Sequence, residues 1–240
     1  MKSFTRIFIS CTLTLFLLCP IATSAQWNKK PYDEWSEKDA DKLLKNSPWA
    51  RTETFTDASA MFRSVQGQTP TTGTVGTPQT ALYVNFRIRF LSAKPVRMAV
   101  KRMTELKHKE EVPAELASSL DDFVNTEFKD LIIVVVNVDS DQPGPNASQA
   151  ISLLQTTSTA AIKNNTFLQV GKERVFLQEY QTPRSDGLGA RFLFPRLVDG
   201  KPFITADEKE IRFVAELSSS HKLNQRFKIK DMMYEGKLEY

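Results

Sequence analysis

The residues best suited to chemistry in this chain are carboxylates that directly follow an apolar run. Asp139 and Asp141 come immediately after residues 131–138, and Asn146 lies in the same polar stretch. Carboxylate and amide oxygens are the ligands that hard divalent cations such as Ca²⁺ and Mg²⁺ prefer in proteins. The spacing therefore allows a divalent-cation site, and with it a metal-dependent hydrolase or phosphatase that uses Asp139 and Asp141.

The same stretch is also typical of an ordinary turn. Residues 142–145 are Gln-Pro-Gly-Pro, which are not the Thr and apolar residues that follow the paired aspartates of magnesium-dependent phosphotransfer sites. Asp, Ser, Gly, Pro and Asn are the usual turn residues. We therefore favour a polar turn that leaves a strand and caps the next helix.

No organic cofactor is expected, because residues 187–189 (Gly-Leu-Gly) lack the third glycine of a dinucleotide-binding loop.

The chain offers few groups for nucleophilic catalysis or for a transition-metal site. Its histidines are His108 and His221, and its two cysteines are Cys11 and Cys19. A hydrolytic triad needs a nucleophile, a histidine and an orienting carboxylate, and no serine is surrounded by the glycines of a nucleophile elbow. We expect both histidines to be exposed to solvent, and we lean toward a protein that is not an enzyme.

Basic residues gather between residues 87 and 109, where eight Lys and Arg stand against Glu105 alone. A strand and a helix could present these cations on neighbouring faces, with Arg97 and Lys101 forming a binding site for acidic glycan or lipid surfaces. The alternative, which we favour, is a solvated helix face paired with the acidic residues of 110–127. Aromatic residues do not interleave with the cations, so we expect no nucleic-acid partner.

A short N-terminal helix is predicted upstream of these residues. Ser36 is a good N-cap residue, and Asp39 occupies the capping-box position three residues later. A helix this short is not stable alone, so its apolar side chains must dock on the rest of the protein or bind in a groove of a partner. The side chains concerned are Trp35, Leu43, Leu44 and Trp49.

The organisation of the chain follows from its changes in composition. Thr, Gly, Pro and Gln dominate one internal stretch, which is typical of a flexible linker or a long surface loop. We predict four parts: a signal peptide at 1–25, a Trp-rich helical segment at 26–56, a linker at 57–80, and a core domain at 81–240.

The core domain is predicted to be α+β. Residues 82–90 alternate apolar with polar, which predicts a strand with one buried face and one wet, basic face. Residues 131–138 are continuously apolar, which is typical of a central strand buried on both faces. Helical periodicity dominates the first half of the domain, and a period of two dominates the second, where Asp199-Gly200 predicts a hairpin turn. We expect a sheet with helices packed on one face.

The first 25 residues have the features of a secretory signal peptide. Lys2 and Arg6 precede an apolar run, and small residues lead to a cleavage site after Ala25. The run is shorter than the roughly 20 residues that span a bilayer, so a retained anchor is less well supported, as is lipidation at Cys19. Cleavage removes both cysteines and leaves 30 basic against 28 acidic residues, a net charge of +2.

Residues 32–50 follow the pattern Y-x-x-W-S-x-x-D-A-x-x-L-L-x-x-S-P-W-A, and the likeness continues in blocks at 91–97, 192–196 and 227–240. This pattern resembles the opening of a group of exported bacterial proteins of unknown function. The resemblance implies a periplasmic or secreted protein of the bacterial envelope, and it implies no activity or site residue. We therefore expect a non-catalytic binding or interaction module, whose partner is an envelope protein or a surface ligand, with no transmembrane segment in the mature chain.

Overall fold

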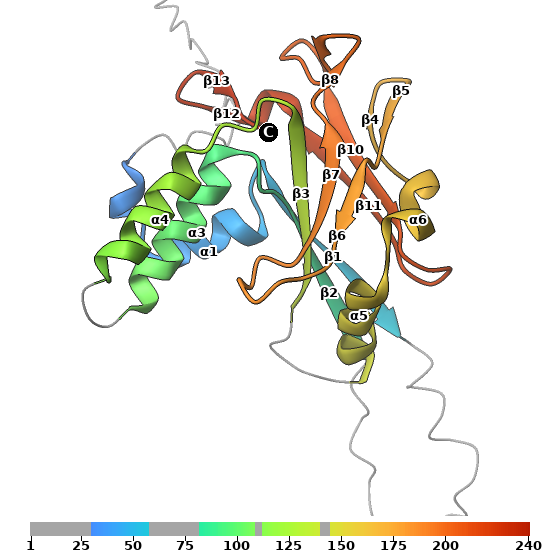
Figure 1. The fold of residues 1–240 in the computed structure, drawn as a ribbon, viewed down its shortest axis with the longest axis horizontal. Helices are drawn as coiled ribbons and strands as arrows, with labels where there is room; N and C mark the ends of the chain where they lie inside the picture. Colours follow the sequence, from blue (N-terminus) through green and yellow to red (C-terminus); the bar gives the residue numbers. More distant parts are fainter. Residues whose placement is uncertain (1–29, 58–81, 109–111, 140–144) are drawn as a thin grey trace, which may run out of the picture.

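Two antiparallel sheets face each other in the part of the chain that the computed structural model describes, residues 30–57, 82–108, 112–139 and 145–240 (Figure 1). The predicted signal peptide (1–25), the predicted linker apart from residue 57, and Asp141 lie outside these residues. Helices dominate the first half of the described chain and hairpins the second, so the predicted α+β class is confirmed.

The larger sheet has five strands in the order β1-β2-β3-β7-β6, all antiparallel to their neighbours. The strands are β1 (Ala50–Asp57), β2 (Leu82–Phe90), β3 (Leu131–Val138), β6 (Glu179–Gln181) and β7 (Ala190–Pro195). The apolar run becomes β3, the central strand, and its five residues from 132 to 136 are all buried. The prediction of a central strand buried on both faces is therefore confirmed.

The smaller sheet covers one face of the larger sheet, which we call the inner face. Its strands lie in the order β11-β10-β4-β5, with bounds β4 (Thr166–Val170), β5 (Glu173–Phe176), β10 (Glu210–Glu216) and β11 (Lys222–Lys228). Aromatic rings join the sheets: Phe213 lies edge-on to Phe192 at 5.5 Å between ring centroids, and Phe90 to Phe227 at 4.9 Å. Because side chains alternate between the two faces of a strand, these rings point to the same side and form one continuous apolar layer between the sheets.

Three helices lie on the opposite, outer face of the larger sheet (Figure 1). They are α1 (Glu37–Lys45), α3 (Lys94–Lys107) and α4 (Ala114–Asn125). The predicted capping box is confirmed, since the Ser36 hydroxyl accepts from the Asp39 amide and the Asp39 carboxylate accepts from the Ser36 amide. The outer face of β2 is not as wet as predicted. Arg89 is only 6% exposed, because α1 packs against β1 and β2 from this side.

Helix α5 (Pro145–Thr156) lies on the inner face instead, so the helices do not share one face as predicted. It packs against β2 and β3 through Ala147, Ala150 and Leu154, which are buried. The phenolic hydroxyl of Tyr180, an inner-face residue, donates to the carbonyl of Leu154. Helix α5 therefore covers apolar surface of the larger sheet beside the smaller sheet. A short helix, α6 (Thr159–Ile162), follows it.

Short hairpins complete the second half of the chain. Asp199 and Gly200 both have positive φ values, 51° and 76°, and join β8 (Leu197–Val198) to β9 (Lys201–Pro202), so the predicted turn is confirmed. A second short hairpin closes the chain. Glu235 and Gly236, again with positive φ, form the turn between β12 (Met233–Tyr234) and β13 (Lys237–Leu238).

Candidate functional site

The four side chains predicted to dock or to bind a partner all face inward. Trp35, Leu43 and Trp49 are at most 1% exposed, and Leu44 is 9% exposed. The Trp49 indole donates to the carbonyl of Glu239 at 2.8 Å, and β1 pairs with β2 along its whole length. The N-terminal segment thus docks on the protein's own core and supplies an edge strand to its larger sheet.

The described members of the predicted metal site lie on opposite faces of the larger sheet. Asp139 accepts a hydrogen bond from the guanidinium of Arg87, which is an outer-face residue of β2. Asn146 begins α5 on the inner face. Within the part of the chain that is described, the neighbour of Asp139 is therefore a cation rather than the further oxygen ligands that a divalent cation needs. Among the described residues, no three His, Cys, Asp or Glu side chains converge on one point.

Arg97, one of the two predicted anion-binding residues, is 4% exposed and holds loops together. Its guanidinium lies 5.0 Å from the centre of the Phe128 ring, and burial lowers the pKa of Arg97 to about 10. It donates to backbone carbonyls of Leu91, Ser92, Val124 and Thr126. With its donors directed at these carbonyls, Arg97 does not present a cation to an acidic surface, which corrects the predicted role.

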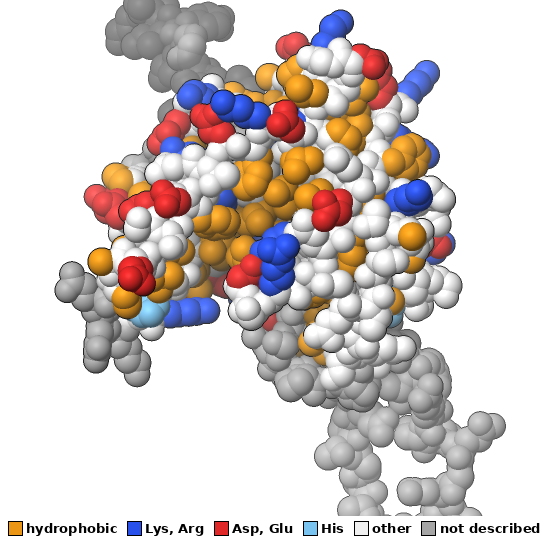
Figure 2. Space-filling view, viewed as in Figure 1, with side chains coloured by type: hydrophobic (Ala, Val, Ile, Leu, Met, Phe, Trp, Pro, Cys, Tyr) orange, Lys and Arg blue, Asp and Glu red, His pale blue; other side chains and the backbone are white. Residues whose placement is uncertain are grey.

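Lys101, the second predicted anion-binding residue, is 6% exposed and also has partners inside the protein. Its ammonium forms ion pairs with Asp121 and with Glu105, and lies 5.3 Å from the centre of the Tyr32 ring. Burial acts to lower the pKa of Lys101, but the hydrogen bonds to Asp121 and Tyr32 outweigh it and raise the pKa. On the face shown in Figure 2, Lys and Arg side chains are interspersed with Asp and Glu rather than gathered in one patch.

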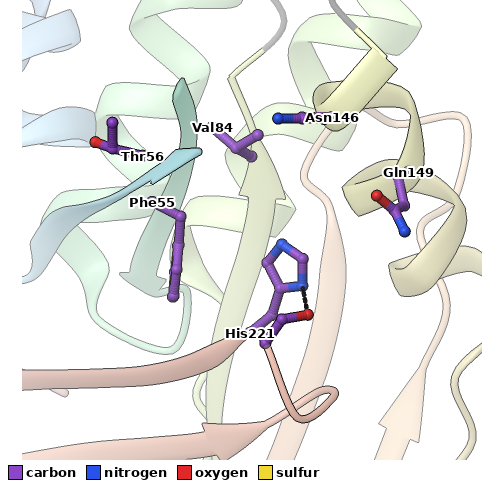
Figure 3. A pocket seen from close by; sticks show the side chains of 7 residues that line it. Phe55, Thr56, Val84, Asn146, Gln149 and His221 are labelled. Carbon is purple, nitrogen blue, oxygen red and sulfur yellow. Dashed lines mark hydrogen bonds between the residues drawn. The ribbon is translucent and has the colours of Figure 1, made fainter. Parts of the chain in front are cut away.

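A pocket that no sequence pattern indicated lies where both sheets meet α5. Its volume is about 330 Å³, which falls within the range of about 300–1,000 Å³ typical of small-molecule sites. Strands β1 and β2, the start of α5 and the turn between β10 and β11 supply its walls (Figure 3). The lining residues are Phe55, Thr56, Val84, Asn146, Gln149, Ser220 and His221.

His221 is the polar centre of this pocket and is not the exposed turn residue that the sequence predicted. Its ring packs against both Phe55 and Phe86, with centroid distances of 5.4 and 5.7 Å. Burial lowers the pKa of His221, so the imidazole is neutral at neutral pH. His108, by contrast, is exposed as predicted.

Hydrogen bonds orient the His221 ring. The hydroxyls of Ser218 and Ser220 each lie 3.2 Å from its Nδ1 atom. The Ser218 oxygen already accepts the His221 amide N–H, so its own proton is available to donate to Nδ1. This arrangement favours the tautomer that carries its proton on Nε2, and Figure 3 shows that the Nε2 edge of the ring is turned toward the pocket.

This arrangement differs from a catalytic dyad or triad. In such sites one imidazole nitrogen contacts the nucleophile and the other contacts a carboxylate. Here both serine hydroxyls lie at Nδ1, and none of the described residues that line the pocket is a carboxylate. The geometry is therefore suited to holding a ligand by hydrogen bonds and apolar contact.

Sequence patterns could not have found this pocket. Phe55 and His221 are separated by 166 positions in the chain, and His221 is flanked by three serines that are typical of an exposed turn. Of the pocket residues, Asn146 was predicted to belong to a metal site, and His221 was predicted to be exposed to solvent.

Comparison of the chain with protein-family models, with curated proteins and with solved structures gave no match. Within the described residues, the helices are too short or too polar to cross a lipid bilayer.

Proposed function

We propose that this protein is an exported, non-catalytic binding module of the bacterial envelope. Export is inferred from residues 1–25, which combine a basic start, an apolar run and small residues before Gln26. The resemblance of residues 32–50 to exported bacterial proteins points to the same compartment.

The observation that carries the binding function is the pocket around His221. It combines apolar walls with a small number of converging polar groups, which is the usual composition of a small-molecule site. Four separate parts of the chain build it, and the ring of His221 is fixed by aromatic packing and by serine hydroxyls. A site held in this way loses little conformational entropy when it binds a ligand.

The metal-dependent hydrolase has less support, because Asp139 is paired with Arg87 and is separated by the sheet from Asn146. The binder of acidic surfaces has less support because Arg97 and Lys101 are buried and bonded within the protein.

The test begins with protein purified from the periplasmic or culture fraction of an expressing bacterium. Its intact mass is expected to match cleavage between Ala25 and Gln26, and a full-length mass would contradict export by cleavage. A library of small uncharged fragments is then titrated into ¹⁵N-labelled protein. We expect chemical-shift changes to concentrate at Thr56, Gln149 and His221. Binders that map only elsewhere, or the absence of any binder, would overturn the assignment of this pocket.

A further inference from the structure

We propose that a hollow on the outer face of the larger sheet, beside α4, is a second binding site. Its ligand is a free fatty acid, whose chain lies on Ile133 and Leu193 and whose carboxylate lies against Arg191. The His221 pocket is built on the inner face of the same sheet, so this site is separate from it and goes beyond the binding function proposed above.

The hollow results from incomplete cover of the outer face. Helix α1 packs on β1 and β2, whereas α4 packs mainly on α3 and stands beside β3 and β7 (Figure 1). Figure 2 shows apolar side chains gathered in the space between α4 and these strands, with charged side chains at its edge. Leu116, Leu120 and Phe123 of α4 accordingly stay half-buried. Apolar patches of this kind typically mark a ligand or interaction site.

The pairing of β3 with β7 builds the floor of the hollow. Phe192 points to the smaller sheet, so its neighbour Leu193 points to the outer face. Leu193 pairs with Ile133, and these side chains are 7% and 8% exposed. The next outer-face pair, about 7 Å further along the strands, is Leu131 with Pro195, and both are half-buried. The result is a narrow apolar strip, which suits a single acyl chain.

A cation lies at one end of this strip. Arg191 is the outer-face residue of β7 that precedes Leu193 by two positions. Its Nη2 donates to the carboxylate of Asp186, whereas its Nη1 has no hydrogen-bond partner in the described part of the chain. Leaving a guanidinium N–H without an acceptor costs free energy. A ligand carboxylate beside the apolar strip would supply that acceptor as a charge-assisted hydrogen bond.

A second arginine makes this end of the strip positive overall. Arg89 pairs with Val135 from one side and Arg191 pairs with it from the other, so the two arginines flank the same residue of β3. Among the described side chains, the hydrogen-bond partner of Arg89 is the amide oxygen of Asn137 and not a carboxylate. Burial lowers the pKa of Arg89 to about 10, so it is still charged at neutral pH. Asp186 offsets only one of the two charges, and the site therefore favours an anionic head group.

The experiment is an NMR titration of the ¹⁵N-labelled protein with decanoate below its micelle concentration. Three comparison probes are 1-decanol, which has no charge, decyltrimethylammonium, which has the opposite charge, and hexanoate, which has a shorter chain. We expect decanoate to bind saturably, to shift the amide signals of Ile133, Leu193 and Phe123, and to bind about tenfold more tightly than either ten-carbon comparison probe. Hexanoate should bind more weakly by up to about fourfold for each methylene that it lacks.

Two variants and a matched control test the role of charge. Arg191→Gln is expected to weaken decanoate binding about tenfold and to leave 1-decanol binding unchanged. Asp186→Asn releases Arg191 from its partner and should tighten decanoate binding about twofold to fivefold. Arg226→Gln also removes an arginine that pairs with a carboxylate, but on the smaller sheet, and should leave binding unchanged. Asp186 is exposed in a turn, so Asp186→Asn decides the test if Arg191→Gln does not fold.

Each contrary outcome overturns a stated part of the proposal. Equal affinities for decanoate and 1-decanol, or tighter binding of decyltrimethylammonium, would refute the recognition of an anionic head. Decanoate signals that map away from the hollow, or no binding of any ten-carbon probe, would overturn the site itself. Binding of the protein to phosphatidylglycerol vesicles but not to decanoate would identify the hollow as a membrane contact. None of these results bears on the fragment titration of the His221 pocket, so the two proposals fail separately.

Discussion

Replacement of Leu43 by alanine tests whether the N-terminal helix is part of the protein's core. Leu43 is 0% exposed and lies on the face of α1 that packs against α3 and the larger sheet. Truncating a fully buried leucine costs about 2–5 kcal/mol, because apolar contact is lost and a cavity remains. We expect Leu43→Ala to lower the free energy of unfolding by about 3 kcal/mol, a large part of the total of about 5–15 kcal/mol for a domain.

The assay is urea unfolding followed by tryptophan fluorescence, which reports on α1 through Trp35 and Trp49, and by circular dichroism, which reports on the whole chain. Both signals are expected to show a single shared transition at a lower urea concentration than in the unaltered protein. In a thermal scan the midpoint should fall by about 6–12 °C, given about 2–4 °C per kcal/mol for a domain of this size. Lys38→Ala, at an exposed position of the same helix, should change stability by less than about 0.5 kcal/mol.

One result would refute this reasoning. If Leu43→Ala shifts only the fluorescence transition and leaves the circular dichroism transition in place, then α1 undocks independently and the segment is an appendage. The earlier alternative, that Trp35, Leu43, Leu44 and Trp49 serve a partner, would then regain support. A coincident shift of both transitions would place these side chains in the cooperative core.

Two further predictions concern buried cationic and titratable groups. Arg97→Lys keeps the charge but cannot reach the four carbonyls that the guanidinium bonds, so urea unfolding should show a loss of about 2–4 kcal/mol. Arg184→Lys, at an exposed position, should show almost none, and an equally small loss for Arg97→Lys would contradict the structural role. The pKa of His221 is lowered from an ordinary value of 6.5. Below about pH 6.5 the unfolded chain therefore binds more protons than the folded one, and stability falls as the pH drops through the lowered pKa. Unfolding measured between pH 7.5 and 5.5 should show a smaller decrease for His221→Phe than for the unaltered protein, and equal decreases would contradict this prediction.

Local patterns predicted the elements that depend on local residues. The apolar run of β3, the capping box at Ser36 and the turn at Asp199-Gly200 each depend on neighbours in sequence, and each is found in the structure. The prediction that the helices share one face of the sheet did not hold for α5. Periodicity shows which face of a helix is buried, but it does not show which face of the sheet the helix covers.

Functional residues were harder to predict, since their roles depend on distant partners. Arg97 was predicted to be a surface cation because its backbone partners lie up to 29 positions away in the sequence. His221 looked like a solvated turn residue because nothing near it in sequence reveals Phe55 or Phe86. Composition gives the number of charges in a segment, whereas burial depends on the tertiary fold.

The contacts of Glu239 have a consequence for the order in which the protein can fold. Its carboxylate accepts from the amide of Lys94, at the start of α3, and its carbonyl accepts from the indole of Trp49. The first of these partners lies 145 positions upstream and the second 190. When the chain emerges from a ribosome or a membrane channel with its N-terminus first, α1, β1 and α3 lack their contacts with Glu239 until the final residues have also emerged. Folding would then be a late, collective event, and the apolar side chains of α1 would stay exposed until Glu239 had emerged.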